Sequence, residues 1–111
     1  MTRTGVLEPT GPNRSFATCR RPDPLDARSP AEFTMIMRRY LVWAGDWSYQ
    51  ELEYLCGGLV SARTFQQVLE GNRLPRYVLL MAFVTACVGE DEAESRRWLT
   101  AWRILRGRIG H

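Results

Sequence analysis

The chain has 111 residues, 45% of them hydrophobic, which is enough for one small domain with a compact core. No run approaches the ~20 apolar residues of a membrane helix, and the N-terminal sequence lacks the apolar stretch of a signal peptide. We therefore expect a cytoplasmic protein with no membrane contact. The formal charge of +3 lacks the general basic character of a nonspecific DNA binder, so any basic surface must be local.

Residues 1–28 hold four of the six prolines and show no apolar periodicity, which predicts a disordered N-terminal tail. Arg14, Arg20 and Arg21 in this tail either form a basic arm that touches DNA or belong to an inert segment. The three cysteines of the chain are far apart and lack CxxC spacing, which argues against a disulfide framework and a zinc site.

The predicted folded domain spans residues 29–107 and begins with a helix. Ser29 is the expected N-cap, Pro30 fits the first turn and Glu32 completes a capping box. Apolar residues then recur at helical spacing until the helix ends near Gly45. Arg38 and the following arginine lie opposite the apolar stripe, on a face that we expect to be solvated.

Two short helices follow. Ser48 and Glu51 form a capping box that starts one helix, and Gly57 with the next glycine ends it. Ser61 starts the second of these helices, and Gly71 is expected to close it. Its apolar residues should face the core, while its polar residues face outward.

Two more helices complete the predicted domain. The fourth starts at residues 74–75, is densely apolar from Val78 onward and stops at Gly89. The last begins around Asp91, because acidic residues favour a helix N-terminus, and ends at Gly107 before a short C-terminal tail over 108–111. No segment alternates like a strand. The sequence thus predicts an all-α fold, a compact bundle of about five short helices.

The helix that starts at Ser61 carries the clearest functional signal. Its outward residues include an arginine and two glutamines. Arginine can form two hydrogen bonds with guanine in the major groove of DNA, and glutamine can do the same with adenine. The expected base-reading residues are Ser61, Ala62, Arg63, Gln66 and Gln67.

Several stretches of the chain resemble Xre-type, lambda-repressor-like helix-turn-helix domains of the kind found in Streptomyces and other actinobacteria. These stretches are SPAEF (29–33), SYQELE (48–53), RTF (63–65), EGNRLPR (70–76), AFVTACVGE (82–90) and RWLTAWR (97–103). The resemblance implies a helix-turn-helix in which the helix from Ser61 is the recognition helix. The chain departs from the family in a longer connection before Phe65 and in Glu53, which stands where a small residue is usual. The crossing of the two helices is therefore expected to differ.

The flanking residues are candidates for DNA backbone contacts. Polar side chains in the first turn of a helix can bind a phosphate, and arginines after the recognition helix suit the same role. The expected backbone contacts are Tyr49, Gln50, Thr64, Asn72, Arg73, Arg76 and Tyr77.

A single recognition helix reads only a few base pairs, so the protein is expected to act as a homodimer or in tandem. The pair Trp98 and Trp102 in the last helix either fills the core or forms the surface for a second copy or a protein partner.

These features predict a sequence-specific binder of double-stranded DNA, a small transcriptional regulator or antitoxin-like repressor associated with the nucleoid. The alternative is a protein–protein interaction module on the same scaffold, which the low net charge, Glu53 and the acidic residues at 90–94 favour. An enzyme is not expected. The only histidine is His111, and we predict no catalytic residue, cofactor or metal site.

Overall fold

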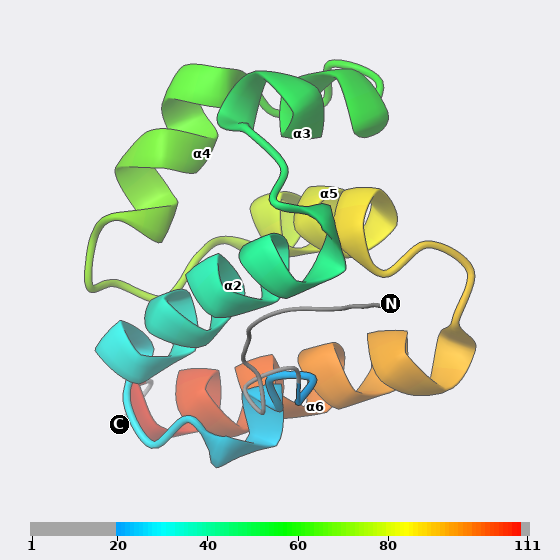
Figure 1. Ribbon diagram of the computed structural model, residues 1–111. Coiled ribbons are helices and arrows are strands. Elements are labelled where there is room, and N and C mark those ends of the chain that lie inside the picture. Colours follow the sequence, from blue (N-terminus) through cyan, green and yellow to red (C-terminus); the bar gives the residue numbers. More distant parts are fainter. Residues whose placement is uncertain (1–19, 110–111) are drawn as a thin grey trace, which may run out of the picture.

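The computed structural model describes residues 20–109, which fold into five α-helices and one 3-10 helix with no strand among them (Figure 1). This confirms the predicted all-α fold. The elements are η2 (Pro24–Asp26), α2 (Pro30–Gly45), α3 (Tyr49–Leu55), α4 (Ala62–Leu69), α5 (Tyr77–Cys87) and α6 (Glu92–Ile109).

Serine side chains cap the first three α-helices. The hydroxyl oxygens of Ser29, Ser48 and Ser61 each accept a hydrogen bond from the backbone amide three residues later, at 3.1, 3.1 and 3.2 Å. At Ser48 the carboxylate of Glu51 also accepts from the Ser48 amide, so the capping box is complete. These bonds satisfy amides that lack a partner within the helix, and they confirm the predicted starts.

Glycines with a positive φ angle mark the ends of two helices, α3 and α5. Gly57, Gly58 and Gly89 have φ angles of +71°, +79° and +75°, the left-handed region in which glycine ends a helix easily. Gly107 has no positive φ, and α6 continues past it to Ile109. The predicted helix end at Gly107 and the tail boundary at 108 are therefore wrong. Residues 110–111 lie outside the described part of the chain.

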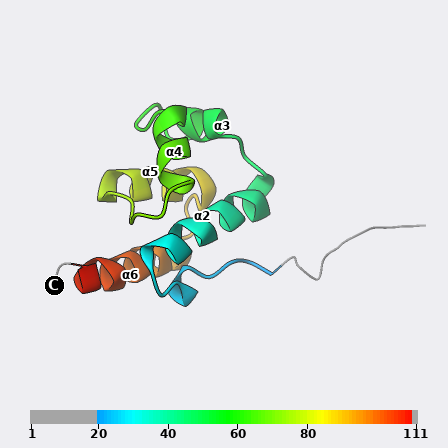
Figure 2. The ribbon, with the colours of Figure 1, turned by 90° about the vertical axis from the view of Figure 1, so that its left-hand side faces the viewer.

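The helices form three levels (Figures 1 and 2). α3 and α4 lie at one end, α2 and α5 cross the middle, and α6 lies at the other end with η2 beside it. Trp98 of α6 joins the lower two levels. Its ring makes T-shaped contacts with Phe33 and Tyr40 of α2 and with Phe83 of α5, at centroid distances of 5.6, 5.1 and 5.2 Å.

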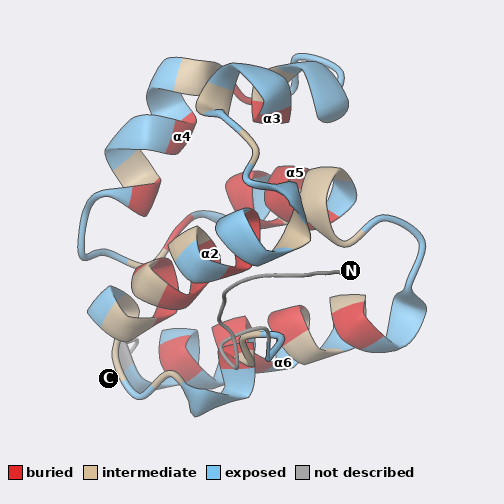
Figure 3. Ribbon diagram, in the orientation of Figure 1, coloured by how far each residue is buried: buried red, intermediate tan, exposed pale blue. Residues whose placement is uncertain are grey.

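The tryptophan pair of α6 belongs to the core. Trp98 is fully buried and Trp102 is only 6% exposed, and the buried face of α6 is turned toward α2 and α5 (Figure 3). The hypothesis that these two rings form a surface for a second copy or a protein partner is therefore wrong. A domain this small needs both large side chains to fill its interior.

Part of the predicted disordered tail packs against the domain. Pro24 of η2 is buried, and Asp23 forms an ion pair with Arg97 of α6. Arg21 lies 3.5 Å from the buried carboxylate of Glu94, also on α6. The prediction of disorder is thus wrong for residues 20–28, because composition alone does not show ion pairs with residues far along the chain.

Residues 1–19 lie outside the described part of the chain, and with them Arg14. Of the expected basic arm, Arg20 is exposed, while the guanidinium of Arg21 is engaged by Glu94 and lies 6.0 Å from the ring centroid of Trp43.

α5 is the most apolar helix, with Leu79, Leu80, Ala82, Phe83 and Val84 all buried. Its second residue, Val78, was expected to face the core, yet its side chain is 54% exposed. Within residues 20–109, no helix combines the length and the apolar character that crossing a membrane requires.

Candidate nucleic-acid interface

The helix predicted to recognise DNA is α4, and it has one buried and one exposed face. Phe65 and Leu69 are fully buried beneath it. Arg63, Gln66 and Gln67 are exposed on the opposite side. Because these three positions are separated by three and four residues, they share one face of the helix.

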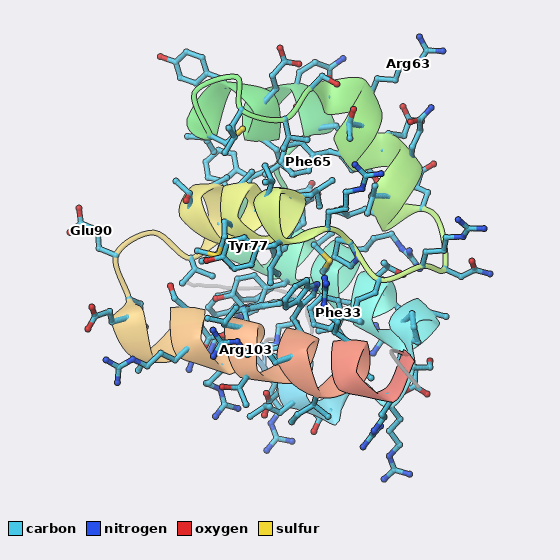
Figure 4. The ribbon with its side chains drawn as sticks, turned by 180° about the vertical axis from the view of Figure 1, so that it is seen from behind. Phe33, Arg63, Phe65, Tyr77, Glu90 and Arg103 are labelled. Carbon is cyan, nitrogen blue, oxygen red and sulfur yellow. The ribbon has the colours of Figure 1, made fainter. Side chains whose placement is uncertain are left out.

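Arg63 projects away from the body of the protein. Figure 4 shows its side chain at the outer corner of the domain, pointing away from the other helices. It forms no ion pair with any described carboxylate. The other two predicted base-reading residues differ, because Ala62 is half-buried and the Ser61 hydroxyl caps α4 and lies 2.9 Å from the Thr64 hydroxyl.

Glu53 connects α3 to the start of α4. Its Oε1 accepts a hydrogen bond from the backbone amide of Ala62 at 2.8 Å. A carboxylate at a helix N-terminus satisfies a free amide and favours the positive end of the helix dipole. The larger residue at position 53 thus spans the gap between the helices, and sequence reasoning missed this contact because it joins residues in two helices.

The C-terminal end of α4 is held by α2. The hydroxyl of the buried Thr34 donates to the carbonyl oxygen of Gly71 at 2.9 Å, and the guanidinium of Arg38 donates to the carbonyl oxygen of Leu69. The expectation that Arg38 lies on a solvated face is therefore wrong. α4 is fixed at both ends, so its exposed face is presented in a defined orientation.

The two backbone-contact candidates on α3 are placed differently from each other. The Tyr49 hydroxyl donates to Glu70 Oε2 at 3.1 Å, which ties the start of α3 to the end of α4. Burial, together with this hydrogen bond to Glu70, raises the pKa of Tyr49 above its usual value. Gln50 is exposed and lines a shallow hollow beside Glu53 and Tyr54.

The remaining backbone-contact candidates follow α4. Asn72, Arg73 and Arg76 are exposed on the connection to α5, between one groove of 820 Å³ that Thr64 also lines and a second of 660 Å³. We call residues 72–76 the connecting ridge, since they line both grooves. The indole nitrogen of Trp102 donates to the carbonyl oxygen of Pro75 at 2.7 Å, which fixes the ridge to α6.

Tyr77 comes directly after the ridge and is 48% exposed. Its ring packs against that of Trp102 at a centroid distance of 5.7 Å.

Charge divides this part of the surface in two. Arg73 and Arg76 have no ion-pair partner among the described carboxylates, and neither groove has an aspartate or glutamate among its described lining residues. In contrast, the three acidic residues of this region, Glu51, Glu53 and Glu70, lie on α3 and at the end of α4. The basic side chains of this region are those of the connecting ridge, Arg63 and, in the second groove, Arg106.

Comparison with known proteins gives no relative: no protein-family model, curated protein or solved structure matches the chain.

Proposed function

We propose that the protein binds double-stranded DNA, with α3 and α4 acting as a helix-turn-helix of the Xre-type, lambda-repressor-like kind. The observation that carries this proposal is the exposed face of α4, where Arg63, Gln66 and Gln67 share one side of a helix that is fixed at both ends. A rigid helix with such a face suits the major groove, because reading base edges requires side chains held in a defined position.

In this proposal Arg63 is the principal base-reading residue. Its guanidinium would donate two hydrogen bonds to the O6 and N7 atoms of guanine, and Gln66 or Gln67 would pair with adenine N6 and N7. Ala62 would contribute an apolar contact, as to a thymine methyl group. Ser61 acts mainly through its cap, which sets where α4 begins.

Phosphate contacts would come from the connecting ridge. Arg73 and Arg76 are exposed and unpaired among the described residues, and Asn72 lies beside them. Gln50 and Thr64 would extend these contacts along α3 and α4, while Tyr49 would have to exchange its bond with Glu70 for one with a phosphate. Such contacts orient a protein on the duplex without reading its sequence.

One recognition helix reads only a few base pairs, so we propose that two copies bind adjacent half-sites. This arrangement suits a small transcriptional regulator or an antitoxin-like repressor that acts at the nucleoid.

Selection of duplexes from a random DNA pool tests the proposal directly. The full chain is used for the selection, and the best duplex is then titrated at several salt concentrations. We expect one enriched motif and an affinity that falls steeply with salt, because the ridge arginines displace counterions from phosphates. A palindromic motif would indicate a dimer. Absence of any enriched motif, with binding lost at physiological salt, would contradict the proposal.

A second candidate function is a protein-interaction module that does not read DNA. The position of Glu53 favours it, because this carboxylate lies at the N-terminus of α4, where a DNA backbone would approach, and Glu70 lies at the other end. The duplex selection separates the two functions, since an interaction module would enrich no sequence.

A further inference from the structure

The larger groove beside the connecting ridge has apolar walls. It lies between α4 and the start of α5 and has a volume of 820 Å³. Its apolar lining residues are Val60, Val68, Leu74, Pro75, Val78 and Leu79. Apolar surface of this kind is stabilised when a partner covers it.

Val78 is the most exposed of these residues, at 54%. It is the second residue of α5, where a polar side chain would serve the helix equally well. Its neighbour Tyr77 is also 48% exposed. The fold therefore does not require a large apolar side chain at position 78, whereas a partner in the groove would contact one.

The charges around the groove have one sign. Arg73 and Arg76 line both the larger groove and the second groove of 660 Å³. Arg106 lines the second groove as well, with its guanidinium 5.1 Å from the ring centroid of Trp102. No acidic residue is among the described residues that line either groove. An occupant with both carboxylates and apolar side chains would match this surface.

The two grooves also adjoin. Both are lined by residues 72–76, so they meet at the connecting ridge, and we call the two grooves together the track. Two adjoining grooves suit an extended or helical segment better than a compact small molecule, because such a segment can place side chains in both. Phosphates of DNA would pair with the arginines, but charged groups give no reason for apolar walls beside them.

We propose that the track along the connecting ridge binds an acidic amphipathic segment of a partner protein. Apolar side chains of the segment would pack against Val78 and Leu74, and its carboxylates would pair with Arg73, Arg76 and Arg106. This site does not depend on DNA binding by α4. Because its lining includes Arg73, Arg76 and Gln67, however, a bound segment would compete with DNA both at the ridge and at that glutamine.

A displayed library of random peptides of about 15 residues, roughly four turns of helix, tests this site. Peptides that bind a double variant, Arg73→Glu with Arg76→Glu, are first removed from the library. The remaining peptides are then selected for binding to the unchanged full chain. We expect the selected peptides to combine Asp or Glu with large apolar residues. The best peptide is then synthesised and its Kd is measured by fluorescence anisotropy. Selection of no peptides, or of peptides without acidic residues, would overturn the proposal.

Two single variants separate this site from the proposed DNA-reading face. Val78→Ser should weaken peptide binding about tenfold, since it removes a buried apolar contact, and should leave DNA binding unchanged. Arg63→Ala should weaken DNA binding and leave the peptide Kd unchanged. Circular dichroism confirms that both variants are folded. If Val78→Ser leaves the peptide Kd unchanged, the apolar wall is not part of a peptide site. If Arg73→Ala weakens DNA binding only, the ridge belongs to the nucleic-acid interface alone. Either result overturns the proposal.

Discussion

Glu53 and Ala62 are nine residues apart, yet the Glu53 carboxylate accepts a hydrogen bond from the Ala62 backbone amide at 2.8 Å. This bond joins the middle of α3 to the first turn of α4 across the connection that contains Gly57 and Gly58. The two glycines take left-handed φ angles, which lets the chain turn back so that the two residues meet. The orientation of the exposed face of α4 therefore depends on an acidic residue in α3.

Glu53→Ala should lower the free energy of unfolding by about 0.5–2 kcal/mol, because it leaves a helix N-terminal amide without its partner. Glu53→Gln keeps an oxygen acceptor at the same place, so it should cost less. Urea unfolding followed by circular dichroism measures both variants.

Glu53→Gln also removes a negative charge close to the proposed DNA-reading face, and it should therefore tighten DNA binding for all sequences alike. Glu90→Gln is the matched control, because Glu90 lies on the α5–α6 connection, far from Arg63 (Figure 4).

Equal unfolding energies for Glu53→Ala and the unchanged protein would show that the bond between Glu53 and the Ala62 amide does not stabilise α4.

The parts of the fold that depend on local sequence could be predicted. Ser29, Ser48 and Ser61 each cap a helix through an amide three residues away, so a short stretch of sequence contains both partners of each bond. Gly57 and Gly89 end helices for a similar local reason.

The contacts that orient the candidate site join distant residues and were missed. Arg38 donates to the carbonyl of Leu69, and Trp102 donates to that of Pro75. Nothing in the sequence near Arg38 distinguishes a partly buried side chain that bonds another helix from a solvated charge. The packing of residues 20–28 against α6 was missed because Asp23 and Arg97 are far apart in the chain.

Arg63→Ala should weaken binding to the selected duplex and relax the preference for one base, by about 1–3 kcal/mol if the contact with guanine is bidentate. The same variant should bind random duplexes almost as well as the unchanged protein. Titration of the selected duplex, of its single-base variants and of a random duplex measures these effects.

Arg103→Ala is the control for Arg63→Ala. Arg103 is an exposed arginine on α6, well separated from Arg63, so its loss changes the net charge by the same amount (Figure 4). If the two variants weaken DNA binding equally, α4 is not the recognition helix.

Trp98→Ala should lower the free energy of unfolding by about 3–5 kcal/mol, which a domain of this size can barely tolerate. The ring is fully buried and contacts Phe33, Tyr40 and Phe83, so its removal opens a cavity between α2, α5 and α6.

Trp98→Phe should cost less than Trp98→Ala. Its smaller ring keeps part of the packing and removes an indole N–H that has no hydrogen-bond partner among the described residues. Ile104→Ala is the control, since Ile104 is 46% exposed on the same helix. If Trp98→Ala lowers the free energy of unfolding no more than Ile104→Ala does, Trp98 is not central to the core.

Stability should fall at high pH because the buried Tyr40 and the half-buried Cys87 resist ionisation. Burial, assisted by the negative charge of Glu94, raises the pKa of Tyr40 from 10.0 to about 12, and burial raises the pKa of Cys87 from 9.0 to about 12. Both groups are neutral when protonated and bind their protons more tightly in the folded state. Their contribution is therefore complete below the unfolded pKa and is lost as the pH rises toward the folded value.

Tyr40→Phe isolates the tyrosine, since phenylalanine keeps the ring but cannot ionise. We expect the unchanged protein to lose stability from pH 9 upward and Tyr40→Phe to lose less of it between pH 10 and pH 12, by about 2 kcal/mol. Cys87→Ala should remove the part of the loss that begins near pH 9. Tyr49, whose pKa is also raised, contributes to the slope in both variants. Urea unfolding at a series of pH values measures how the free energy of unfolding depends on pH. If this dependence is the same for Tyr40→Phe and the unchanged protein, Tyr40 ionises as readily in the folded chain as in the unfolded one.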